Sequence, residues 1–140
     1  MKNTRAIAWI VGAWLLSHVV LIAGHVLLIF LYSTLIAPGL EPSAYQDFAL
    51  ASGPWYSILL GGPVFYVVGR LFASRFGSAA RRFALIVWAL YSITDLTIVL
   101  MVGTVITPLF ATQWLVSQGV KLIAVLLATR RSDNVNGDSA

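Results

Sequence analysis

The third of four apolar segments, Phe83 to Val105, carries a carboxylate at Asp95 near its middle. An Asp at the centre of a membrane helix costs roughly 2.5–3.5 kcal/mol, so it needs either a partner or a function. Trp88 and Tyr91 precede it at helical spacing, which places all three side chains on one face. These residues are the first candidates for a proton or ligand site.

A cation lies at a comparable depth in the last apolar segment. Lys121 is ~12 Å from the segment's end at Thr129, and Asp95 is ~18 Å from Phe83, counted along ideal helices. Gln118 precedes Lys121 on the same predicted face. Two interpretations remain open: a buried ion pair or hydrogen-bonded pair that fixes helix registry, or a proton- or substrate-linked site.

The two histidines, His18 and His25, both lie in the first apolar segment. Their separation corresponds to ~10.5 Å of helical rise, too far for one metal ion or one haem face. The chain has no cysteine, which excludes a Cys-based metal site. We therefore expect no metal and no cofactor. We expect hydrogen-bonded interior histidines, with His18 serving Asp95, although a dimer that pairs His18 with its copy stays open.

The sequence has no nucleophile motif, phosphate-binding loop, dinucleotide fingerprint, HExxH pattern or acidic metal pair. Gly61, Gly62 and Pro63 form a break within the second apolar segment. Pro63 has no N–H to donate to the carbonyl of Leu59, so we expect a kink there.

Composition places these segments in lipid. Of 140 residues, 59% are hydrophobic and 10% charged, whereas a soluble domain has roughly 25% charged residues. We predict an all-α integral membrane protein: a four-helix transmembrane bundle with short loops and a kinked second helix. Its single domain is residues 1–131, with spans at 6–36, 53–74, 82–105 and 109–129, a short interfacial helix within 40–52, and a disordered polar tail at 132–140.

The positions of the basic residues predict the orientation. All except Lys121 flank the first span's start, the turn between the second and third spans, or the fourth span's end: Lys2, Arg5, Arg70, Arg75, Arg81, Arg82, Arg130 and Arg131. Four spans place these groups on one side, so both termini are predicted to be cytoplasmic. The net charge of +4 is then a topological signal, and no nucleic-acid partner is expected. A bacterial inner membrane is the simplest location.

The aromatic residues suggest two uses. Trp9, Trp55 and Trp114 suit the belts at the membrane interfaces. Trp88 and Tyr91 lie deeper and would line a pocket for a flat or long apolar ligand.

Three functional classes remain. The first expectation is a small structural or accessory membrane protein with a buried polar layer of Asp95, Lys121 and His18. The alternatives are a proton-linked carrier acting as an oligomer, and an intramembrane enzyme or binder for a lipid, quinone or isoprenoid. Membrane lipids, a homo-oligomer or another membrane protein are the expected partners. In size and span number the chain resembles small multidrug transporters, but their coupling carboxylate lies in the first span, where this chain has histidines, so no residue role carries over.

Overall fold

A computed structural model describes residues 2–103 and 105–130, and the tail predicted at 132–140 lies outside this range. The described chain is helical and contains no strand. In order, its elements are α1 (Lys2–Leu31), a π-helical turn η1 (Tyr32–Ile36), α2 (Pro42–Phe76), a 3₁₀ turn η2 (Gly77–Ala79), α3 (Ala80–Met101) and α4 (Pro108–Thr129). The predicted all-helical class is confirmed.

Three helical stretches in the described range are long and apolar enough to cross a membrane: Thr4–Ile36, Pro42–Met101 and Pro108–Thr129. The middle stretch has 60 residues and would reach ~90 Å if it were straight. The chain instead reverses at Gly77, whose φ of 51° suits a residue without a Cβ. The stretch therefore consists of two helices, α2 and α3, joined by η2.

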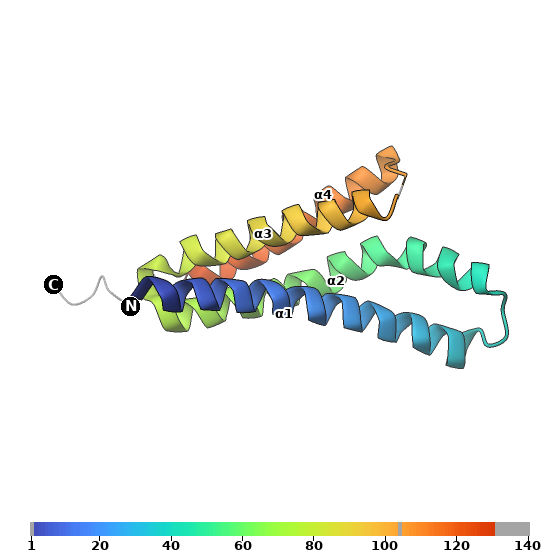
Figure 1. The fold of residues 1–140 in the computed structure, drawn as a ribbon, viewed down its shortest axis with the longest axis horizontal. Coiled ribbons are helices and arrows are strands. Elements are labelled where there is room, and N and C mark those ends of the chain that lie inside the picture. Colours follow the sequence, from blue (N-terminus) through green and yellow to red (C-terminus); the bar gives the residue numbers. More distant parts are fainter. Residues whose placement is uncertain (1, 104, 131–140) are drawn as a thin grey trace.

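The four helices form two antiparallel hairpins, α1 with α2 and α3 with α4 (Figure 1). The start of α1, the α2–α3 turn and the end of α4 all lie at one end of the molecule. The hairpins lie together at this end and separate toward the other, where α1 and α2 extend beyond α3 and α4 (Figure 1). The end that holds the α2–α3 turn is called the basic end, because Arg75, Arg81 and Arg82 flank this turn. The opposite end is called the far end.

The second helix differs from the prediction. It begins at Pro42, so the expected interfacial helix within 40–52 and the second span form one continuous helix, and Pro54 lies in its interior. Contacts with α1 on both sides of Pro54 explain the continuity. His25 Nε2 lies 3.0 Å from Ser52 Oγ, and its ring stacks on Tyr56 with centroids 5.2 Å apart. These contacts hold both flanks of the proline against α1.

The kink predicted at residues 61–63 stays a prediction. The structure shows another role for two glycines of α2, which is close contact with α4. A Cβ at Gly61 would lie 2.5 Å from Lys121 Cε, and one at Gly69 would lie 2.6 Å from Ala128 Cβ. Both positions face α4. Small residues let two helix backbones approach closely in a membrane, and here they bring α2 against α4.

We predict that Gly69→Ala destabilises the fold by about 1–3 kcal/mol, the usual cost of overpacking a close contact. Ala128 Cβ is fixed by its backbone and cannot turn away. Gly119 of α4 has nothing within 4 Å of its Cβ position, so Gly119→Ala is the matched control and gains up to about 1 kcal/mol of helix propensity. Thermal unfolding in mild detergent measures both. Equal melting temperatures for the two variants would contradict the close contact.

Candidate functional site

Polar side chains of α3 and α4 face each other in two rows. On α3, Trp88, Ser92 and Asp95 follow at steps of four and then three residues, which keeps them on one helix face. On α4, Trp114 and Gln118 lie four residues apart and face this row.

Gln118 is the centre of the contact between these rows. Its backbone carbonyl accepts from Trp88 Nε1 at 3.1 Å, and its side-chain oxygen accepts from Ser92 Oγ at 2.9 Å. Its amide nitrogen donates to Asp95 Oδ2 at 3.1 Å. Trp114 Nε1 donates to the same carboxylate oxygen at 2.8 Å. Asp95 is half-buried, and these two donors replace part of the hydration that a carboxylate loses on burial.

Lys121 belongs to a second group that joins α2 to α4. Its side chain is fully buried. Nζ donates to Ser57 Oγ of α2 and to Ser117 Oγ of α4, each at 2.8 Å. It also lies 4.8 Å from the centroid of the Tyr91 ring, within the range of a cation–π contact. Gly61 supplies the space for the alkyl part of this side chain.

A direct bond between Asp95 and Lys121 was one of the two open interpretations, and the structure does not contain it. Among the described residues, no hydrogen bond or ion pair joins the two side chains; each has its own partners. The spacing explains the difference. Ser117 lies one helical turn before Lys121 on the same helix face, so its hydroxyl accepts from the ammonium group. The carboxylate of Asp95 instead accepts from Gln118 and Trp114.

Tyr91 lies where all four helices meet, and it is buried within the core. Its ring contacts His18 of α1, with centroids 4.3 Å apart, and Phe65 of α2, at 5.0 Å. With Lys121 on α4, it touches one side chain from each other helix. Tyr91 is therefore a packing centre, and its predicted part in a ligand pocket stays a prediction.

His18 does not serve Asp95. Its Nδ1 lies 3.0 Å from the carbonyl oxygen of Trp14, one turn earlier in α1. Its Nε2 is buried without a hydrogen-bond partner among the described residues. His25 lies nearer the far end, against Ser52 and Tyr56. One nitrogen of His18 is therefore hydrogen-bonded, as predicted for an interior histidine. The other nitrogen can still form a hydrogen bond.

Two of the predicted belt tryptophans have other roles. Trp114 donates to Asp95, and Trp9 lies under the guanidinium of Arg75, 4.4 Å from the ring centroid to Cζ. Trp55 is exposed on α2, as a belt residue would be. Trp9 and Trp114 thus contact side chains of other helices in the fold.

Sequence reasoning missed Ser57 and Ser117, the two hydroxyls that hold Lys121. A signal for Ser117 was present, because it precedes Lys121 by four residues on one helix. Ser57 lies 64 residues away on α2, and only the α2–α4 contact brings it to the amine. Small polar residues are frequent in apolar helices, so the sequence alone did not distinguish this serine.

A serine hydroxyl beside a lysine amine is also the geometry of a Ser–Lys nucleophile. Acyl transfer further requires access for a substrate and free donors for an oxyanion. Ser117 is 2% exposed and Lys121 fully buried, and both lie within a helix, where the backbone N–H groups are already bonded. This arrangement suits the solvation of an ammonium group and does not suit catalysis.

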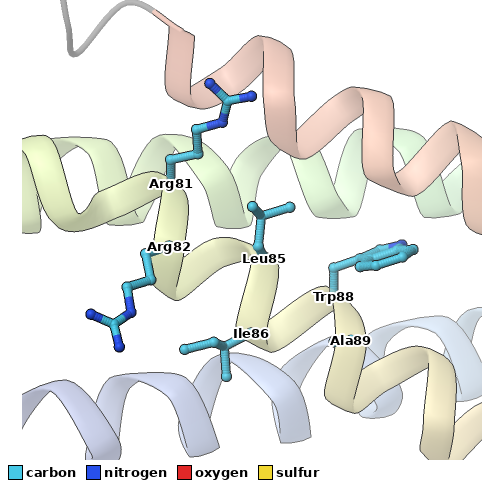
Figure 2. Close-up of a pocket in the computed structure, with 6 residues that line it drawn as sticks. All are labelled: Arg81, Arg82, Leu85, Ile86, Trp88 and Ala89. Carbon is cyan, nitrogen blue, oxygen red and sulfur yellow. The ribbon is translucent and has the colours of Figure 1, made fainter.

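Two shallow, open apolar grooves lie on the described chain, and neither is lined by Asp95 or Lys121. One follows α3 and is lined by Arg81, Arg82, Leu85, Ile86, Trp88 and Ala89, with a volume of about 820 Å³ (Figure 2). The other, about 490 Å³, lies between α2 and α4 and includes Tyr66 and Pro63. Of the predicted pocket residues, Trp88 lines a groove and Tyr91 does not.

The described residues hold no cluster of three or more His, Cys, Asp or Glu side chains that would bind a metal ion. Comparison of the chain with protein-family models, with curated proteins and with solved structures gives no match. Any function for this protein must therefore be argued from its own geometry.

We predict that the double variant Ser57→Ala/Ser117→Ala loses about 3–5 kcal/mol of stability, because it leaves the buried ammonium without acceptors. Adding Lys121→Met should recover most of this loss, since an apolar side chain of similar length then fills the site. Thermal unfolding in mild detergent measures both variants. A triple variant no more stable than the double variant would show that the serines stabilise the fold independently of Lys121.

Proposed function

We propose that this protein is a small multi-pass membrane protein with a structural or accessory role, in which the buried polar layer holds α2, α3 and α4 in register. The observation that carries the proposal is that the buried polar side chains form hydrogen bonds with one another. Lys121 Nζ is bound by Ser57 and Ser117, and Asp95 by Trp114 and Gln118. Together these bonds link α2, α3 and α4. In a membrane, apolar contacts between helices differ little from contacts with lipid, so interhelical hydrogen bonds of this kind select one packing of the helices.

A proton-linked carrier, acting as an oligomer, is the second candidate. Two observations favour it over an enzyme. Asp95 and Lys121 remain unpaired with each other, and His18 Nε2 keeps bonding capacity in the protein interior. Ionisable groups of this kind within membrane segments often mark proton pathways. An enzyme or binder for a lipid, quinone or isoprenoid acting at Asp95 would need a groove open to that carboxylate, and the two apolar grooves lie elsewhere.

For topology, we propose four spans with both termini in the cytoplasm of a bacterial inner membrane. What supports this is the gathering of basic residues at one end. Arg75, Arg81 and Arg82 flank the α2–α3 turn, and this turn lies beside the start of α1 and the end of α4 (Figure 1). The α1–α2 connection at the far end instead carries Glu41. The positive-inside rule assigns the basic end to the cytoplasm.

The absence of cysteine from the sequence allows a clean topology test. We predict that a thiol introduced by Ser78→Cys reacts only with a reagent that reaches the cytoplasm, and that one introduced by Leu40→Cys reacts with an impermeant reagent added outside. Both positions are exposed in loops, so neither substitution disturbs packing. Labelling of intact cells and of inverted vesicles gives the readout. Labelling of both positions from one side would rule out a four-span arrangement.

We predict that Asp95→Asn keeps the melting temperature within the error of wild type, because its side-chain oxygen still accepts from Trp114 and Gln118. Asp95→Leu should lose about 1.5–3 kcal/mol for each of the two donors left unpaired. For a structural role, rapid pH changes on proteoliposomes should give no transient current with wild-type protein. A wild-type current that Asp95→Asn abolishes, with unfolding unchanged, would favour the proton-linked carrier.

A further inference from the structure

The groove on α3 consists of two parallel stripes, and each stripe begins with an arginine. Arg81 heads the stripe that continues with Leu85 and Trp88, and Arg82 heads the stripe with Ile86 and Ala89. Each stripe advances by four and then three residues, the spacing of one helix face. The groove is therefore basic at one end and apolar along the rest of its length (Figure 2).

The two arginine side chains leave α3 in different directions, Arg81 toward α4 and Arg82 toward α1 (Figure 2). Both residues are exposed. Among the described residues, neither takes part in a hydrogen bond or an ion pair, in contrast to Arg75, which lies over Trp9. A planar guanidinium matches a phosphate group with two parallel hydrogen bonds. With no partner of their own among the described residues, the two guanidinium groups at this end of the groove offer a site for an anion.

The length of the groove fits one leaflet of a bilayer. From Arg82 to Ala89, α3 rises ~10 Å, and half of a ~30 Å hydrocarbon core is ~15 Å. With the arginines at the headgroup level, Leu85, Ile86 and Ala89 lie beside the acyl chains. Trp88 closes the deep end as a fixed wall, because its Nε1 is held by the carbonyl of Gln118 at 3.1 Å.

We propose that this groove binds an anionic phospholipid, with its phosphate between Arg81 and Arg82 and an acyl chain along Leu85 and Ile86. The charge at the arginine end of the groove selects an anionic headgroup, since basic pockets on the inner side of membrane helices attract such lipids. The apolar stripes favour a lipid over a soluble phosphate, since an acyl chain can contact them and a free phosphate cannot. The proposal does not depend on the role of Asp95 and Lys121.

The test is native mass spectrometry of the full chain in mild detergent, titrated with dioleoyl phosphatidylglycerol or dioleoyl phosphatidylcholine. We expect one retained phosphatidylglycerol, and roughly tenfold or more weaker binding to Arg81→Gln/Arg82→Gln. The matched control is Arg70→Gln/Arg130→Gln, which removes the same charge from the same end outside the groove and should bind as wild type does. A second variant, Ala89→Phe, fills the apolar part of the groove and should weaken binding with both arginines intact.

Several outcomes would overturn the proposal. Equal losses in the two double variants would show general attraction to the basic end. Equal retention of phosphatidylcholine would remove the role of charge. Unchanged binding by Ala89→Phe, or competition by glycerol phosphate at the concentration of the lipid, would show that the acyl chain does not occupy the groove. Circular dichroism of each variant confirms that the helices are intact.

Discussion

The fold depends on the burial of one ammonium group. The Lys121 side chain is fully buried, and a buried charge or amine is stable only where neighbouring groups replace water. Ser57 and Ser117 accept its hydrogen bonds, the Tyr91 ring offers its π-face, and Gly61 leaves room for the alkyl chain. These four neighbours come from α2, α3 and α4, so satisfying one nitrogen determines how three helices pack. The close approach of α2 to α4 is a direct consequence.

A second network joins Trp114 and Gln118 of α4 to Asp95 of α3. Helix α4 therefore contributes to this network and to that of Lys121. Gln118 and Trp114 face α3, while Ser117 and Lys121 face α2 and the bundle centre. Successive residues of one helix, Ser117 and Gln118, thus bond to different neighbours. A rotation of α4 would break both networks together, which is how a few hydrogen bonds specify one packing in a medium where apolar surfaces discriminate poorly.

The two ends of the molecule differ in both charge and packing. At the basic end, the hairpins lie together, and Arg75 covers Trp9 between α2 and α1. Toward the far end they separate, and α1 is held to α2 by the contacts of His25 and by the stacking of Tyr32 on Phe48, with centroids 3.7 Å apart. The proposed lipid site lies at the basic end, where anionic headgroups of the inner leaflet would meet its arginines.

Composition and periodicity were sufficient to predict helices, their approximate bounds and their apolar character, because these follow from local spacing and from the residue types that lipid tolerates. They also identified the polar positions Asp95, Gln118 and Lys121. They did not predict which groups pair, since the Asp95–Lys121 bond that they left open does not form and Ser57 gave no signal of its own. Likewise, the second span was predicted to begin at residue 53, and only the contacts of His25 with Ser52 and Tyr56 explain why α2 continues through Pro54. Pairing depends on helix rotation and approach, which the small residues Gly61 and Gly69 set through tertiary contacts and which no local pattern encodes.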